Sequence, residues 1–197
     1  MMNLTRILAL VGYFVFASIP LNAAAAYVID FGTGLAGSGG TITDLGTTIL
    51  GTNILIGSMV VQGTATSDGT YVVDALLNFD TNANTLSIVG DIGSLGITGD
   101  TLLLGSFTSY GLNFYPGPTE VFDASGTDIK SSALLGSLGI PTNTQFGYFG
   151  FSIQSANGTV TSTDIINTAV VPVPAAVWLF GAGLLGLVGI ARRKKAA

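Results

Sequence analysis

The sequence predicts a mainly β fold: a single β-sandwich or jelly-roll-like domain with one short helix, flanked by an N-terminal signal helix and a C-terminal transmembrane helix. Two observations support this prediction. Between the chain ends, short runs of alternating apolar and polar residues are separated by clusters of Gly, Asn, Asp and Ser. Each end carries its own apolar segment next to basic residues. Several short strands joined by turns are typical of layered β domains.

Strands are expected where side chains alternate between two faces. From Tyr71 to Phe79 every odd-numbered residue is apolar or aromatic, whereas Asp74 and Asn78 lie on the opposite face. The turn-forming run Asp80–Asn84 follows, so residues 70–90 are predicted to form a hairpin. Further strands are expected at Tyr27–Phe31, Thr47–Gln62, Thr101–Tyr115, Phe149–Ile153 and Thr159–Ile166.

One short helix is expected at Ile129–Leu138. Thr127 and Asp128 are suitable capping residues before it, and Gly139 is a typical stop after it. No composition change marks a second domain, so residues 27–171 are interpreted as one domain.

The N-terminus has the pattern of a secretory signal peptide. One arginine precedes the apolar stretch Ile7–Phe16, and an alanine cluster follows. The small residues Ala24 and Ala26 favour cleavage by signal peptidase before Tyr27, and a cut before Ala26 is the alternative. Residues 1–26 are therefore expected to be removed on export.

The C-terminus has three parts. A proline segment comes first, residues 175–191 without any charge follow, and four basic residues come near the end. As a helix the apolar part would span about 25 Å at roughly 1.5 Å per residue, close to the thickness of a membrane's hydrocarbon core. The basic residues should stay on the cytoplasmic side. The flanking parts are Val171, Pro172, Val173 and Pro174 before the helix, and Arg192, Arg193, Lys194 and Lys195 after it.

This tail resembles the PEP-CTERM sorting signals, in the variant that reads Val-Pro-x-Pro-Ala, because a proline motif, a glycine-rich helix and a basic cluster follow in that order. Val173 stands where the namesake motif has Glu. The resemblance implies a Gram-negative bacterium that makes exopolysaccharide. It also implies an exosortase that cuts near Pro172 and Pro174, so that residues 172–197 would hold the precursor in the inner membrane before release to the cell surface or matrix.

Composition excludes several classes of function. The chain has no cysteine and no histidine, which excludes disulfides, thiolate or imidazole metal ligands and Ser-His-Asp catalysis. Residues 27–171 hold all eleven acidic residues and a single cation, Lys130, a formal charge of −10. Such a surface disfavours nucleic acid. The glycine-rich run Gly32–Gly37 matches a dinucleotide fingerprint, but the residues after it are a poor helix start, so no cofactor is expected.

Two acidic groups are candidates for a cation. The first group has the spacing of the ligands in a calcium-binding loop and consists of Asp80, Asn82, Asn84 and Asp91. The sixth position of that loop lacks the glycine that its sharp turn requires. A hairpin turn explains the same residues more simply. The second group consists of Glu120, Asp123 and Asp128. It is interpreted as part of a solvated loop, and a weak cation site is the alternative.

The expected function is an exported, surface-sorted, non-enzymatic protein, a structural component of an extracellular matrix or associated with exopolysaccharide. The first alternative is a carbohydrate-binding or calcium-dependent adhesive module, for which Tyr110, Phe114 and Tyr115 are the candidate aromatic platform. The second is a glycan hydrolase that uses two carboxylates, although no motif singles out a pair.

Overall fold

The computed structural model describes residues 26–34 and 39–169 and contains nine strands there. The helical segments are short: the 3-10 helix η2, Gly93–Leu95, and the α-helix α2, Ser132–Ser137. The strands are β1 Val28–Gly32, β2 Thr41–Asp44, β3 Ile49–Gln62, β4 Gly69–Asp80, β5 Thr85–Ile92, β6 Ile97–Phe114, β7 Thr119–Lys130, β8 Phe146–Ala156 and β9 Thr159–Ala169.

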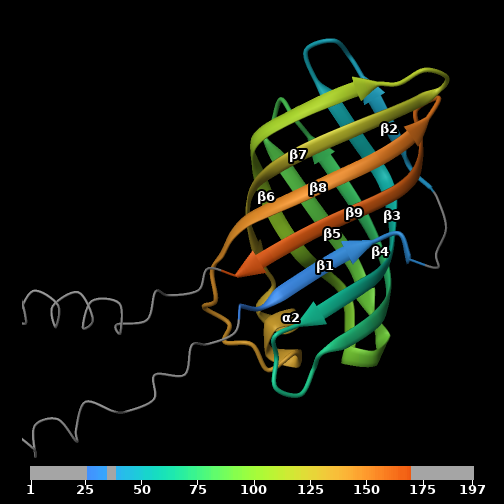
Figure 1. Ribbon diagram of the computed structural model, residues 1–197. Coiled ribbons are helices and arrows are strands. Elements are labelled where there is room, and N and C mark those ends of the chain that lie inside the picture. The colour runs from blue at the N-terminus through green and yellow to red at the C-terminus, as the bar shows by residue number, and fades with distance from the viewer. Residues whose placement is uncertain (1–25, 35–38, 170–197) are drawn as a thin grey trace, which may run out of the picture. The chain divides into compact units, whose positions relative to one another are not determined.

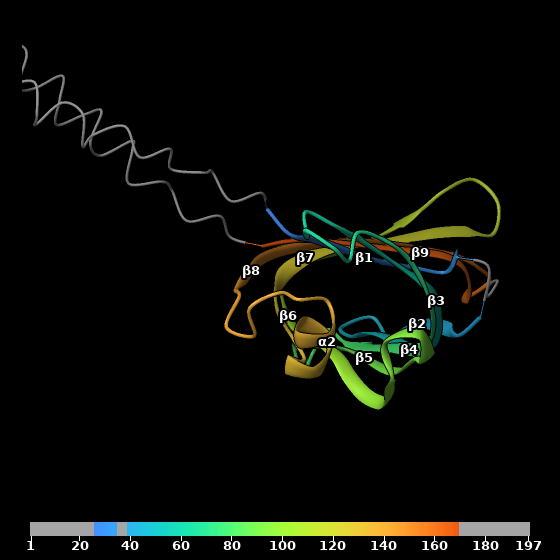
Figure 2. The same ribbon diagram turned by 90° about the horizontal axis from the view of Figure 1, so that it is seen from below.

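The strands form one closed antiparallel barrel (Figures 1 and 2). Neighbours from β3 to β9 pair in chain order, and β1 closes the ring by pairing with both β9 and β3. The short β2 lies between the same two strands further along, so nine strands occupy eight positions. The mainly β class with one short α-helix is confirmed. The predicted sandwich is wrong, because the strands close into one barrel. The alternating pattern could not distinguish the two folds, since each strand of a barrel buries one face just as each strand of a sandwich does.

The first and last strands of the domain are neighbours. Val28 is in register with Thr168, and the N–H of Ala169 donates to the carbonyl of Tyr27 at 2.8 Å. The two ends of the described domain therefore leave the barrel side by side.

The interior is filled by side chains. Phe79 stacks on Phe122 with ring centroids 4.7 Å apart, and further rings contribute edge-to-face contacts. Glycine makes room for these rings. A Cβ at Gly126 on β7 would collide with the ring of Phe149 and with the carbonyl of Ser106, so the aromatic core depends on a glycine there.

The predicted helix is too long at its start. Strand β7 continues to Lys130, and α2 occupies Ser132–Ser137 only. The cap is Ser131, whose hydroxyl accepts from the N–H of Leu134 at 3.0 Å. Asp128 does not cap because it belongs to a strand paired on both sides. Figure 2 shows α2 beside one opening of the ring, where Leu134 is buried in the core.

The hairpin at 70–90 is confirmed as β4 and β5, and the five other expected strands are present with shifted ends. Two strands were not predicted, β2 and β7. The interpretation of Glu120, Asp123 and Asp128 as a loop is wrong, since all three lie on β7. The signal was weak because β7 carries polar residues on both faces, which hides the alternation.

Several predictions fall outside the described residues. They concern residues 1–25, with Ala24 of the cleavage site, and residues 170–197, with the proline segment, the apolar stretch and the basic cluster. Within residues 26–34 and 39–169, no helix has the length and apolar character needed to cross a membrane.

Candidate functional site

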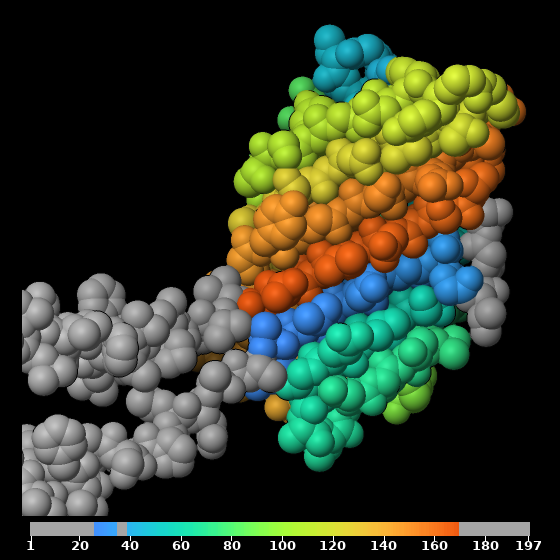
Figure 3. Space-filling view, viewed as in Figure 1, coloured from blue at the N-terminus to red at the C-terminus, as the bar shows by residue number. Residues whose placement is uncertain are grey.

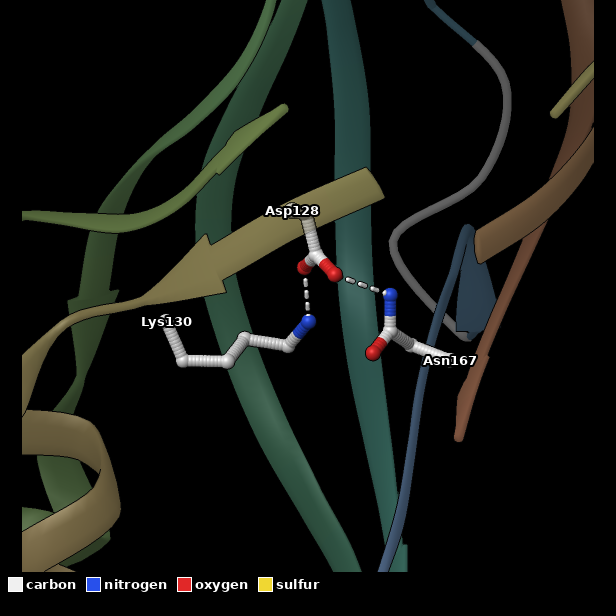
Figure 4. A network of polar contacts seen from close by, with 3 residues as sticks. All are labelled: Asp128, Lys130 and Asn167. Carbon is white, nitrogen blue, oxygen red and sulfur yellow. Dashed lines mark hydrogen bonds and ion pairs between the residues drawn. The ribbon is translucent and has the colours of Figure 1, made fainter. Parts of the chain in front are cut away.

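A polar cluster lies in the barrel interior, built from β7 and β9 (Figure 4). Lys130 forms an ion pair with Asp128, and the side chains of both are fully buried. The Nδ2 of Asn167 donates to the other carboxylate oxygen of Asp128 at 2.6 Å. The Lys130 ammonium also lies 4.5 Å from the centroid of the Phe146 ring, a cation–π contact.

Burial dominates the electrostatics of this cluster. It lowers the pKa of the Lys130 ammonium to about 8, although the charge of Asp128 and its hydrogen bond act in the opposite direction. Among the residues that the structure describes, none forms a hydrogen bond with the Oδ1 of Asn167. An amine with this pKa has the basicity of a catalytic lysine, but its side chain is sealed from solvent. We therefore assign the cluster a structural role.

A shallow groove of about 470 Å³ crosses the outer wall of β7, β8 and β9, and we call it the outer groove. Asp123, Ser152 and Asp164 lie directly opposite one another on the three strands and form a row of hydrogen-bond acceptors. Tyr148 adjoins this row, and its side chain is 59% exposed. The groove thus combines an aromatic ring with oxygen acceptors on an open surface.

Two carboxyl groups interact beside the outer groove. Burial raises the pKa of Asp30 on β1 to about 6, and the charge of Asp164 and a hydrogen bond to it add to this effect. Asp30 and Asp164 are thus the interacting carboxyl groups to which the hydrolase alternative would point, since a glycosidase uses two such groups.

The three candidate aromatic residues occupy the β6–β7 hairpin. Tyr110 packs on the core, with its ring centroid 6.0 Å from that of Phe107 and 6.3 Å from that of Phe122. Phe114 and Tyr115 are 67% and 53% exposed near the hairpin tip. Tyr110 is itself 47% exposed, so all three rings reach the surface of the hairpin, and they form a site separate from the outer groove.

The calcium-loop candidates do not converge. The carboxylate of Asp80 accepts from the backbone N–H of Asn82 at 2.8 Å, within the β4–β5 turn. The side chain of Asn84 accepts from the N–H of Phe107 at 2.8 Å. Asp91 lies at the far end of β5, where it accepts from the N–H of Gly99 at 2.5 Å. Among the described residues, no three acidic side chains come together as metal ligands would.

The three side chains of the second acidic group lie in different surroundings along β7. Glu120 accepts from the hydroxyl of Ser155 at 2.8 Å, Asp123 faces the outer groove, and Asp128 is in the core. The sequence does not single out Asn167, although its position between the inward-facing Ile165 and Ala169 places a polar side chain on an apolar face.

Comparisons of the chain with protein-family models, with curated proteins and with solved structures found no match. Function is therefore inferred from the sequence and from the geometry described above.

Proposed function

We propose that this protein is exported and sorted to the cell surface as a non-enzymatic structural component of an extracellular matrix that contains exopolysaccharide. The observation that carries the proposal is the three-part tail, with Pro172 and Pro174 before an apolar stretch and a basic cluster. Signal peptidase and an exosortase are the proposed processing enzymes. The precursor would reside in the inner membrane, and the mature protein at the surface or in the matrix.

Two features of the domain support this proposal. Its first and last strands pair with each other, so cleavage beyond both would leave the closed barrel intact. Its only cation is buried, so the exposed charges are all acidic, which suits a soluble exported surface.

The test is intact-mass analysis of protein released from the producing cells. We expect a mass that lacks residues 1–26 and the segment 175–197. A variant with Pro172→Ala and Pro174→Ala should keep the C-terminal segment and stay with the membrane fraction, whereas the matched variant with Pro116→Ala and Pro118→Ala should be released normally. Released wild-type protein that still carries residues 175–197 would contradict the proposal.

A second candidate function is binding of a neutral glycan, and the outer groove favours it. Sugars pack their C–H faces on aromatic rings and donate hydroxyl protons to acceptors. Tyr148 beside Asp123, Ser152 and Asp164 offers both features. The acidic charge around the groove disfavours an anionic polysaccharide.

Glycan-array binding distinguishes the two aromatic surfaces. Tyr148→Ala should abolish binding if the outer groove is the site, whereas Tyr115→Ala should abolish it if the hairpin tip is. Loss of binding on addition of a chelator would support the calcium-dependent adhesive alternative. Absence of binding to any neutral glycan would contradict this second candidate.

A further inference from the structure

The barrel is closed, yet one strand extends beyond it. Strand β6 pairs with β7 from Leu103 to Phe114, but its pairing with β5 ends at Gly105, opposite Leu86. Residues 109–114, which we call the β6 edge, therefore have β7 on one side and no strand of the described chain on the other. Figure 1 shows this part of β6 as the outermost strand of its face, and Figure 3 shows its atoms along the margin.

The backbone groups of the β6 edge that face outward can be identified. The N–H of Tyr115 donates to the carbonyl of Thr119 at 3.0 Å, so these residues form a hydrogen-bonded pair across the hairpin. Such pairs alternate along an antiparallel ladder. Ser109, Gly111 and Asn113 therefore bond to β7. The N–H and C=O groups of the three alternate residues point to the open side, and these residues are Tyr110, Leu112 and Phe114.

The β6 edge also lacks the charged residues and prolines that protect many edge strands against pairing, although a register shift between Phe107 and Ser109 precedes it. Charged side chains, lysine above all, repel a second strand, and a proline has no N–H to donate to it. Residues 105–119 contain no charged residue, and the two prolines of this segment lie in the hairpin turn, outside the strand. Tyr110 and Phe114 are exposed on one face of the strand, with the partly buried Leu112 between them.

We propose that the β6 edge is an interface at which two copies of this chain join their barrels by antiparallel strand pairing. A two-fold axis at Leu112 sets Leu112 opposite its copy and Tyr110 opposite Phe114 of the other chain. The three residues whose backbone N–H and C=O groups point to the open side then form hydrogen bonds with the other copy. Each aromatic residue also gains an aromatic partner on the same face of the sheet. No charge lies within the paired segment, so the acidic surface does not place like charges opposite each other there.

The position of the edge suits assembly between surface-held copies. Phe114 is in register with Glu120 on β7, and Glu120 with Ser155 at the end of β8. Ala169, the last described residue, is in register with Phe146 at the opposite end of β8. Copies held at their chain ends would therefore present the β6 edge away from the point of attachment. The interface itself depends only on the barrel, so failure of the sorting proposal would not affect it.

Cysteine cross-linking tests the register, because the chain has no cysteine of its own. Hydrogen-bonded antiparallel partners have Cα atoms about 5.5 Å apart, within the range of a disulfide. We expect exported Leu112→Cys to form a covalent dimer under mild oxidation. Tyr148→Cys, an exposed position on the outer groove, is the control and should remain monomeric. Equal cross-linking of the two variants would overturn the proposal.

Sedimentation of the exported protein tests the interface without a covalent bond. We expect a concentration-dependent monomer–dimer equilibrium for the wild type. Phe114→Lys, which removes an aromatic pair and adds a charge to the edge, should raise the dissociation constant at least about tenfold, while Tyr148→Lys should leave it unchanged. Thermal unfolding of both variants verifies that they fold. A wild type that stays monomeric at all concentrations, or a dimer unaffected by Phe114→Lys, would overturn the proposal.

Discussion

Lys130 carries the only positive charge of residues 27–171, and the barrel buries it. Its ammonium is paired with Asp128, whose second oxygen accepts from Asn167. A buried ion pair gains little over apolar packing, but removal of one partner leaves an uncompensated charge. The cluster therefore constrains which side chains can meet in this part of the core.

The Lys130→Met variant tests this account. We expect its free energy of unfolding to fall by about 3–5 kcal/mol, because Asp128 remains buried without its cation. The double variant Lys130→Met with Asp128→Asn should recover most of the loss, since an amide at position 128 is neutral. Urea unfolding measures both. A single variant as stable as the wild type would show that the pair contributes no constraint.

Asp30 makes stability depend on pH in the acidic range. Its pKa is about 6 in the folded protein and 3.8 without the neighbours, so the folded state holds the proton more tightly. The stability from this group is fully present below about pH 4 and is lost as the pH rises through about 6. Asp30→Asn should therefore unfold at a higher temperature than the wild type at pH 7 and at a similar temperature at pH 4. The same substitution at the exposed Asp44 is the control, and an equal gain there would contradict the assignment.

At the scale of the elements, local sequence predicted the strands well and their packing poorly. The alternation from Tyr71 to Phe79 identified β4 because one face of that strand is apolar throughout. Strand β7 escaped because its inward positions include Gly126, Asp128 and Lys130, which are not apolar. Their burial depends on the strands on either side, which the sequence of β7 does not reveal.

Glycine substitutions measure how the core constrains these elements. Gly126→Ala on β7 should lower the free energy of unfolding by about 1–3 kcal/mol, because a methyl group there meets the Phe149 ring and a neighbouring carbonyl. Gly136→Ala on α2 is the matched control. Nothing lies near a Cβ at that position, so it should be neutral or stabilise by about 0.5–1 kcal/mol through helix propensity. Chemical denaturation compares them, and equal effects would refute the packing argument.

At the scale of the molecule, closure of the barrel provides what disulfides provide in many exported domains. The chain has no cysteine, and the stability of the domain depends on the filled interior and on the β1–β9 pairing. A closed sheet has a free edge only where one strand extends beyond its neighbour, as β6 extends beyond β5. The proposed dimer uses that exception.

The closed barrel is also expected to be independent of calcium. A site occupied at a hundred times its dissociation constant would add about 2.7 kcal/mol to stability. Because Asp91 lies apart from Asp80, Asn82 and Asn84, we expect no such change when calcium or a chelator is added during thermal unfolding. A calcium-dependent rise that disappears in Asp91→Asn would contradict the geometry.

The sequence by itself determined the β class, the hairpin at 70–90 and the acidic balance of residues 27–171, because each depends on local pattern or composition. The roles of the two apolar segments at the chain ends stay predictions. Only the tertiary structure decided that the strands close into a barrel, that Lys130 is buried with Asp128 and that β6 keeps an open edge. Alternation states which residues of a strand share a face. It does not state which strands pair or in what register, since those depend on contacts between residues far apart in the chain.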